Sequence, residues 1–347
     1  ETGRLSIKGN WHKNVITDLG HLFGLAFTLR QDVYFTRGYN KHHVTYESDP
    51  MLYAQQRNNN KTTGRFFPQA AANWQYPLIS YQEDYSYLIE PKVMCVVGTR
   101  SQGSRFIPNN DARTFTLDDT SLFLPNRYDG FDRIDSGSRV IGGVEQKIER
   151  SNAEPLFRSI SWFFGQSRRL DSKQVLEHTY MGENNRYSDF VNRIKIEPYR
   201  HVFLRLRNAV DVRTRRQRFM EIGSLIGEPV AQLDIGYVKM ARQCDITKTA
   251  LSQLNWQVSS KINDTWSLSY GEVRNFLRNT TGPLNQYASV AWENDCFKVE
   301  TGLHKTRVQV LDLEPSTGIL FVVTFKNLGS FTPSNTSRYP KSILSQF

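Results

Sequence analysis

The feature that most constrains the fold of this chain is the alternation of apolar and polar residues over long stretches. In LSQLNWQVSSKINDTWSLSY (residues 251–270), apolar side chains occupy every second position on both sides of Asn263-Asp264. A period of two places each set on one face of a strand, so the stretch predicts two antiparallel strands joined by a tight turn. The same pattern recurs in LFGLAFTLRQDVYF (22–35) and HVFLRLRNAVDVR (201–213). These stretches predict an all-β protein.

Read in this way, the whole chain divides into about fifteen or sixteen strands, with no amphipathic helix and no sequence repeat. The predicted strands lie near residues 4–16, 22–36, 65–79, 86–98, 138–149, 154–169, 189–198, 201–213, 217–225, 229–240, 250–262, 265–277, 284–294, 296–309 and 316–328. Many are about 10 to 15 residues long, whereas strands of soluble proteins average about 5 to 6. Strands that cross a membrane need about 9 to 11 residues.

The connections between these strands alternate in length. Tight turns are expected near residues 18–21, 150–153, 227–229, 263–264 and 294–295, and long polar loops near 37–64, 99–137, 170–188 and 241–249. Short turns on one rim and long loops on the other are typical of an outer-membrane barrel, with its periplasmic turns and extracellular loops. We therefore expect an antiparallel transmembrane outer-membrane β-barrel.

Charged residues lie in the middle of several predicted strands, opposite the apolar positions. In a membrane barrel the apolar face meets lipid and the polar face lines the interior. Arg193, Lys195, Arg205 and Arg207 are predicted to face inward on this basis. For each of them, a salt bridge to an interior Asp or Glu competes with contact to an anionic substrate.

The net charge of +10 indicates an anionic partner, such as nucleic acid, anionic lipid or a phosphorylated glycan, or else an ordinary solvated surface. The three cysteines share no CxxC spacing, and His42-His43 has no ligand cluster beside it, so no metal site and no cofactor are expected. No motif of a catalytic site is present. Two alternatives stay open: a general porin or receptor barrel, and a soluble basic glycan-binding β protein.

Two further features concern the end of the predicted sheet. In GILFVVTFKNLG (318–329), apolar residues alternate at Phe321, Val323 and Phe325 and reach Leu328, which fits the terminal-strand signal that barrel-assembly machinery reads by strand pairing. Cys296 follows a turn on the predicted periplasmic rim, where an oxidising compartment permits a disulfide. Residues 331–347 are expected to form a polar tail after a barrel domain spanning residues 1–330.

Several stretches resemble one family of proteins. NWQYPLISYQEDYSYLIEPKV (73–93), PNRYDGFDRIDSGSRVIGGV (125–144), FFGQSRRL (163–170) and the segments from residue 251 onward occur in the order seen in the lipopolysaccharide-assembly outer-membrane proteins, the LptD family. The match in NRYDGFDRIDSGSR is the most specific of these. Together the matching stretches span most of the chain.

This resemblance implies a closed barrel of about 26 strands that takes lipopolysaccharide from a periplasmic bridge protein and inserts it into the outer leaflet of a Gram-negative outer membrane, without catalysis. The implied partners are lipopolysaccharide, a plug lipoprotein in the lumen, the bridge protein and the barrel-assembly machinery; nucleic acid is not among them. Cys296 matches a position that bonds to the family's periplasmic domain, and Asp295 stands where some members have a second cysteine. The last strand, near 318–328, matches one side of the family's lateral gate. The N-terminal periplasmic domain and the first strands of the barrel are expected to lie outside this sequence.

Overall fold

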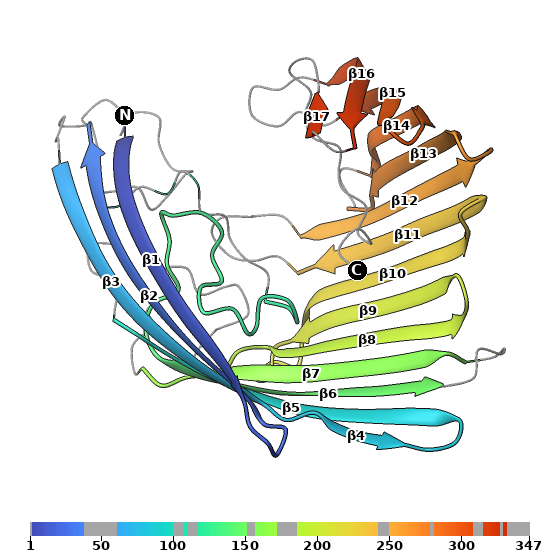
Figure 1. Ribbon diagram of the computed structural model, residues 1–347. Coiled ribbons are helices and arrows are strands. Elements are labelled where there is room, and N and C mark those ends of the chain that lie inside the picture. The colour runs from blue at the N-terminus through green and yellow to red at the C-terminus, as the bar shows by residue number, and fades with distance from the viewer. Residues whose placement is uncertain are drawn as a thin grey trace.

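The computed structural model describes residues 2–37, 61–99, 107, 109, 111, 117–150, 157–171, 186–241, 250–277, 281–307, 315–326 and 329–331. These residues form one antiparallel sheet that curves around a concave interior (Figure 1). Its strands are β1 (Thr2–Ile16), β2 (Leu22–Thr36), β3 (Lys61–Gln75), β4 (Leu78–Tyr81), β5 (Tyr85–Gly98), β6 (Arg139–Arg150), β7 (Ser159–Arg169), β8 (Phe190–Tyr199), β9 (Val202–Val210), β10 (Gln217–Glu228), β11 (Ala231–Met240), β12 (Leu251–Lys261), β13 (Trp266–Asn275), β14 (Gly282–Glu293), β15 (Phe297–Thr306), β16 (Ser316–Phe325) and β17 (Gly329–Phe331). None of the described residues forms a helix that could cross a membrane.

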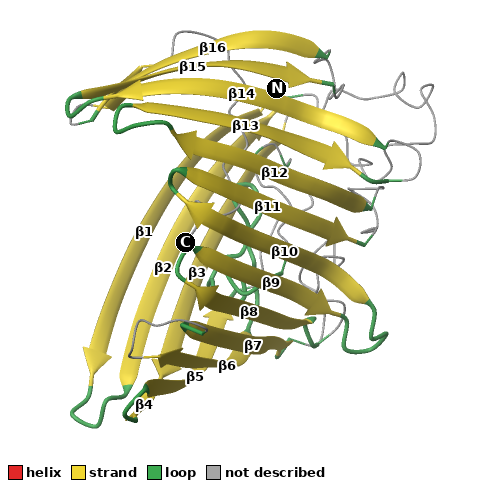
Figure 2. Cartoon of the chain, turned by 90° about the vertical axis from the view of Figure 1, so that its right-hand side faces the viewer, coloured by secondary structure: helices red, strands yellow, loops and turns green. Residues whose placement is uncertain are grey.

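Each strand pairs with its neighbour in the sequence, except that β3 and β4 both pair with β5. The chain therefore runs up and down in steps around the sheet (Figures 1 and 2). β1 lies at one edge and β16 with β17 at the other, and no backbone pairing joins the two edges among the described residues. Short connections follow β1, β8, β10, β12 and β14, and longer ones follow β2, β5 and β7. The predicted all-β antiparallel fold and the asymmetry between the two rims are confirmed.

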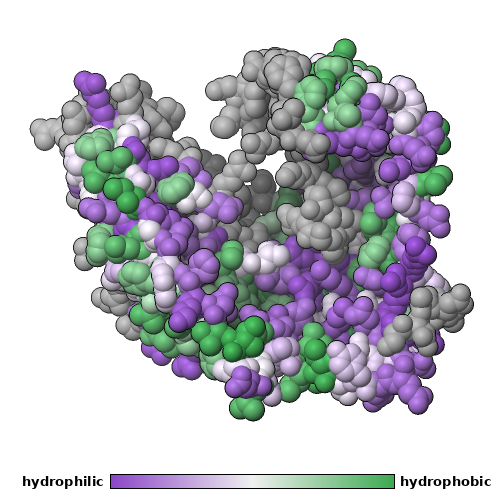
Figure 3. All heavy atoms as spheres, in the orientation of Figure 1, coloured by the Kyte–Doolittle hydropathy of each residue, from purple (hydrophilic) through white to green (hydrophobic). Residues whose placement is uncertain are grey.

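The two faces of the sheet are inverted relative to a soluble protein. From Leu22 to Leu29 the exposed positions of β2 are apolar, with Phe23, Leu25 and Phe27 each more than 40% exposed. The alternate positions on the concave side include Arg30 and Asp32, which are 5% and 0% exposed. Figure 3 shows hydrophobic residues along the lower outer side of the sheet and hydrophilic residues toward the hollow in the middle. This is the arrangement of a membrane barrel, with apolar residues toward lipid and charged residues inside.

Several predicted strands have different limits in the structure. The strand expected at 154–169 begins only at Ser159, and two other strands are broken. The strand expected at 65–79 is interrupted at Tyr76-Pro77, because proline has no N–H to donate to the ladder, and it resumes as the four-residue β4. The strand expected at 316–328 ends at Phe325; the short β17 then pairs back onto Val323–Phe325. The alternation continues through both breaks, so the pattern of residues alone does not reveal them.

Candidate functional site

A segment of the long connection between β5 and β6 lies against the concave face of the sheet. We call residues 117–138 the strap. In Figure 1 it runs between β1–β3 on one side and β8–β9 on the other. Leu117 and Leu122 in this segment are 2% and 0% exposed, so the strap is packed into the interior and is not a surface loop.

Polar side chains shape the strap locally. The Asp118 carboxylate accepts hydrogen bonds from the backbone N–H groups of Thr120 and Ser121, each at 2.9 Å, and this arrangement closes a turn at the start of the strap. Gly130 has a φ of 80°, and a Cβ there would lie 2.5 Å from the carbonyl oxygen of Asp111. Only glycine fits this left-handed position beside another backbone.

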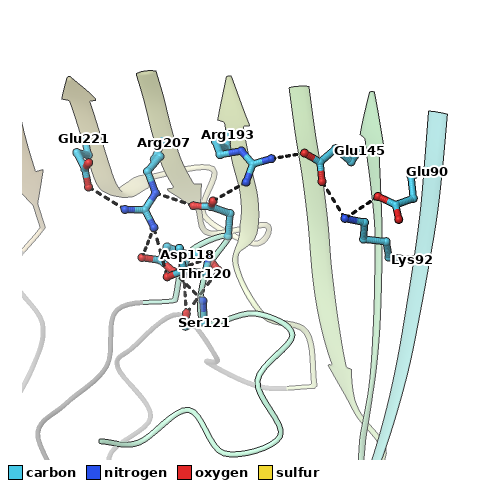
Figure 4. A network of polar contacts seen from close by, with 10 residues as sticks. Glu90, Lys92, Asp118, Thr120, Ser121, Glu145, Arg193, Arg207 and Glu221 are labelled. Atoms are coloured by element: carbon cyan, nitrogen blue, oxygen red, sulfur yellow. Dashed lines mark hydrogen bonds and ion pairs between the residues drawn. The ribbon is translucent and has the colours of Figure 1, made fainter. Parts of the chain in front are cut away.

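The first anchor of the strap is a network in which its own acids bind arginines on β8 and β9 (Figure 4). Arg193 and Arg207 lie directly opposite each other across these strands. Like charges directly opposite each other on neighbouring strands repel, and carboxylates nearby offset this repulsion. Asp119 supplies one to both residues, at 3.1 Å from Arg193 and 2.6 Å from Arg207, and Asp118 lies 2.6 Å from Arg207.

The network continues along the sheet on both sides. Arg207 also contacts Glu221 on β10 at 3.0 Å, and Arg193 contacts Glu145 on β6 at 2.5 Å. Glu145 in turn binds Lys92 at 2.8 Å (Figure 4). The strap acids therefore complete a chain of alternating charges that crosses the interior from β5 to β10.

The second anchor is a single buried carboxylate shared by three arginines. Asp135 is fully buried and lies 2.5 Å from Arg127, 3.1 Å from Arg139 and 2.5 Å from Arg169. Burial alone would raise the pKa of Asp135, but the three guanidinium groups hold this pKa well below its usual range. Arg139 and Arg169 also donate to the strap carbonyl groups of Leu124, Pro125 and Ser136. The strap is therefore held by its backbone as well as by its charge.

The third anchor lies on β2 and β3. Asp32 is fully buried between Arg30, at 3.0 Å, and Arg65, at 2.6 Å. Both arginines donate to the carbonyl oxygen of Phe131 in the strap, Arg65 at 2.6 Å. The guanidinium groups of Arg4 and Arg30 lie over the Phe131 ring, 4.8 and 5.0 Å from its centre. Cation–π attraction of this kind adds to the hydrogen bonds.

Small residues on β6 and β7 make room for apolar side chains of the strap. A Cβ on Gly165 would lie 2.7 Å from Leu122, and one on Gly143 would lie 3.2 Å from Phe123. Phe123 also packs edge-on against Phe163. Gly143 of RVIGGV and Gly165 of FFGQS therefore provide the contact surface for the strap.

The other half of the concave face has a different chemistry. A hollow of about 280 Å³ there is lined chiefly by uncharged polar side chains of β11 to β15. Its lining includes Gln257, Ser259, Ser267, Ser269 and Ser289. Ser269 and Ser289 share a hydrogen bond of 2.7 Å. Lys261, Lys298 and Glu300 also line this hollow. The interior thus has one half in which arginines pair with acids of the strap, and another half lined mainly by serine and glutamine side chains.

Comparison with known proteins settles the family. The family model described as "LptD: LPS transport system D" matches residues 1–266. The chain belongs to the LptD family. No curated protein matches it. As a member of this family of transport and assembly proteins, it is an integral β-barrel protein of the outer membrane.

This LptD-family chain has the fold of a solved outer-membrane receptor. It is similar to the ferric enterobactin receptor PfeA (Q482A mutant) of Pseudomonas aeruginosa, with 9% identity and a TM-score of 0.51 over 93% of this chain and 55% of that one. It also matches the siderophore receptor PirA of Acinetobacter baumannii, with 6% identity and a TM-score of 0.49 over 94% of this chain and 56% of that one. The chain thus spans about half the length of these barrels. At such low identity the likeness shows the fold alone.

The four basic residues expected to face inward lie together on β8 and β9 of the LptD-family sheet. Arg193 and Arg207 contact the strap, and Arg205 contacts Glu221 at 2.7 Å. Lys195 is half-buried opposite Arg205. The sequence did not identify the strap acids as their partners, because these lie 74 to 89 residues away along the chain. The density of Asp and Arg in NRYDGFDRIDSGSR is the one signal that could have pointed to the strap.

The remaining predicted site residues lie near the far edge of the sheet. Cys296 is exposed with a free thiol at the turn between β14 and β15, where its N–H donates to Asn294 at 2.9 Å. On β16, Phe321 and Phe325 are exposed and Val323 is half-buried. Leu328, Cys244 and His42-His43 lie outside the described residues, as does the tail from residue 332. Within the described ranges, no group of three His, Cys, Asp or Glu side chains is placed to hold a metal ion.

Proposed function

We propose that this chain is the C-terminal part of a larger barrel that takes lipopolysaccharide from a periplasmic bridge protein and inserts it into the outer leaflet, without catalysing a reaction. The observation that carries the proposal is the family match over residues 1–266. A general porin or receptor barrel would share this architecture but would not account for the match to the LptD family model. The apolar outer face disfavours a soluble glycan-binding protein, because a soluble sheet would bury that face in a core.

The two halves of the interior give the proposed transport a physical basis. Lipopolysaccharide has an anionic, sugar-rich part and apolar acyl chains. In the hollow of β11 to β15, hydroxyl and amide groups of serine and glutamine can exchange hydrogen bonds with sugars without binding them tightly. In the charged half, the strap acids already neutralise Arg193 and Arg207. We therefore assign the route of the polar part to β11–β15, and to the β8–β9 arginines the role of holding the strap.

The two unpaired edges support a larger closed barrel. In lipid every backbone N–H and C=O group needs a partner, and an open edge strand leaves a row of them without one. β1 and β16–β17 do not pair with each other among the described residues. We propose that further strands close the barrel, that β16 forms one side of a lateral gate and carries the signal for barrel assembly, and that a plug lipoprotein enters the lumen.

The cysteine at the β14–β15 turn fits a link to a periplasmic domain. Cys296 is exposed on the short-turn rim, which faces the periplasm in outer-membrane barrels. We propose that it forms a disulfide with a cysteine of that domain. The full-length protein run with and without reductant should change mobility, and Cys296→Ser should remove the change. Identical mobility for the wild type and this variant would refute the disulfide while leaving the transport proposal intact.

Transport can be tested by placing a photo-crosslinking amino acid at neighbouring positions of β14 in the full-length protein. Ser289 lines the hollow, whereas Val290 is exposed on the outer face near the short-turn rim, where we expect inner-leaflet phospholipid. We expect an adduct with lipopolysaccharide, detected by an antibody to it, at Ser289 and none at Val290. Absence of an adduct at Ser289 and at other positions of the hollow would refute the route. Unchanged surface lipopolysaccharide after depletion of the protein would refute the function.

A further inference from the structure

The hairpin of β4 and β5 has an open backbone edge on the short-turn rim. β4 pairs with β5 on one side only, and no described strand lies along its other side. β2 begins at Leu22, opposite Gln75 at the end of β3, so it does not extend along β4. The position next to β4 in the sheet is therefore vacant among the described residues. This edge lies outside the charged interior, and the inference from it does not depend on the lipopolysaccharide route.

The hydrogen-bond pattern shows which backbone groups face this edge. The N–H of Tyr76 donates to Pro91, and that of Gln82 donates to Tyr85. Bonded and non-bonded pairs alternate in an antiparallel ladder, so residues 76, 78, 80 and 82 point toward β5. The N–H and C=O groups of Ile79 and Tyr81 therefore point to the open side. They stand two residues apart, about 6.6 Å along the strand, at the repeat that another extended backbone presents.

The side chains at this edge are apolar, and lipid does not account for their exposure. In the register of β3 to β5, Leu78 pairs with Ile89 on the outer face, so Ile79 and Tyr81 lie on the inner side, at the mouth of the barrel. They are nevertheless 54% and 79% exposed. Leu19, in the turn that precedes β2, is 77% exposed. Large apolar side chains in water beside an open strand edge are typical of a site for an added strand.

The charge near this edge indicates the kind of partner. Glu83, at the tip of the hairpin, and Asp18, in the β1–β2 turn, are both exposed. The turn lies at one end of the open edge, because His21 stacks on Tyr76 with ring centres 4.2 Å apart. Arg150 lies over the Tyr85 ring beside the hairpin tip, and in a chain with a net charge of +10 the two ends of this edge nevertheless each carry an exposed acid. A segment with Lys or Arg at its ends complements this charge.

We propose that β4 is a docking edge for an extended, basic segment of a periplasmic protein, which adds as a strand beside Ile79 and Tyr81. Backbone hydrogen bonds would provide affinity, and Ile79 and Tyr81 would contact alternate apolar side chains of the segment. The chemistry at the edge matches a polypeptide because its open groups are peptide N–H and C=O at strand spacing.

The experiment uses the full-length protein purified in detergent and a fluorescent synthetic peptide, Lys-Val-Thr-Val-Lys-Val-Thr-Lys. Fluorescence anisotropy should show saturable binding. Tyr81→Pro should weaken it at least tenfold, because it removes an N–H on the open side and leaves the bonds to β5 in place. Tyr81→Phe is the matched control and should bind like the wild type. A mobility shift on heating that matches the wild type shows that each variant has folded.

Three results would overturn the proposal. The first is the absence of saturable binding up to about 1 mM peptide, a concentration that corresponds to about −4 kcal/mol. The second is equal binding by the wild type and Tyr81→Pro, or equal binding of a peptide with Glu in place of Lys. The third is a dimer of the purified protein that Tyr81→Pro abolishes, since this would assign the edge to a second copy of the chain.

Discussion

The shared carboxylate of Asp135 gives the sharpest prediction about the strap. Asp135→Asn keeps the shape of the side chain and removes its charge, so three buried guanidinium groups lose the carboxylate that they share. Breaking one buried ion pair in this way costs about 3–5 kcal/mol. The three contacts are coupled and do not add, and asparagine keeps one acceptor oxygen. We therefore expect a loss of about 3 kcal/mol in the docking of the strap.

This loss can be measured as protease access to the strap. A change of 1.4 kcal/mol is tenfold in an equilibrium constant, so about 3 kcal/mol raises the undocked population about 100-fold. Cleavage by trypsin at Arg127 and Arg133 follows that population when docking is fast relative to cleavage, and its rate should rise by the same factor. The folded sheet should persist, because the ladder between β6 and β7 is unchanged.

A second acid in the strap provides the control for this experiment. Asp129 is exposed, and its replacement by asparagine should change the cleavage rate less than about threefold, as expected for a surface site. If Asp135→Asn also changed the rate less than threefold, the carboxylate would not hold the strap. Loss of the heat-dependent mobility shift would show instead that the whole sheet depends on it.

Three further variants test other contacts. Gly165→Ala should weaken the docking of the strap by about 1–3 kcal/mol in the same protease assay, because its Cβ would lie 2.7 Å from Leu122. Gly142→Ala is the control and should be cleaved like the wild type, because a Cβ there would have nothing within 4 Å. Arg207→Ala should also speed cleavage of the strap, at least tenfold, since it removes the guanidinium group that both strap acids Asp118 and Asp119 bind. Partial recovery in Arg207→Lys would show that charge matters, and equal rates for Arg207→Ala and Arg207→Lys would show that the fork of donors is needed. The pKa of Asp211 is lowered to about 2, because hydrogen bonds from backbone N–H groups and Arg218 outweigh the effect of burial, which would raise it. Because the pKa of Asp211 is lower in the folded turn than its unfolded value of about 4, the ionised carboxylate stabilises the turn at pH values above about 4, and this stabilisation is lost as the pH falls toward 2. Asp211→Asn should therefore speed amide exchange in residues 211–216 at pH 6, and the difference from the wild type should shrink toward pH 2.

The strands were predictable because their signal is local. Every predicted strand corresponds to one in the structure, mostly within about two residues at each end. The inversion of the faces was also readable, since buried Arg30 and Asp32 share one face of a strand whose opposite face carries exposed Phe23, Leu25, Phe27 and Leu29. A period of two needs only a few adjacent residues to be recognised, and it fixes both the strand and the faces of the sheet.

The strap could not be predicted in this way. Residues 99–137 read as one long polar loop on the extracellular rim, yet the structure places residues 117–138 inside the curve of the sheet. The contacts that hold it join Asp118 to Arg207 and Arg65 to Phe131, residues separated by 89 and 66 positions. Irregular backbone has no period, so the sequence contains no local pattern that shows which arginine an aspartate will meet.

The arginines of β8 and β9 explain why the strap lies where it does. Arg193 opposite Arg207, and Lys195 opposite Arg205, place four positive charges side by side on the concave face. An empty interior would have to stabilise this repulsion with water alone, whereas the acids of the strap neutralise it directly. The strap gains in the same contacts, because its polar backbone would otherwise be buried without partners. The sheet and the strap therefore stabilise each other, and the charge pattern of β8 and β9 is better understood as the docking surface for residues 117–138 than as an open site for an anionic substrate.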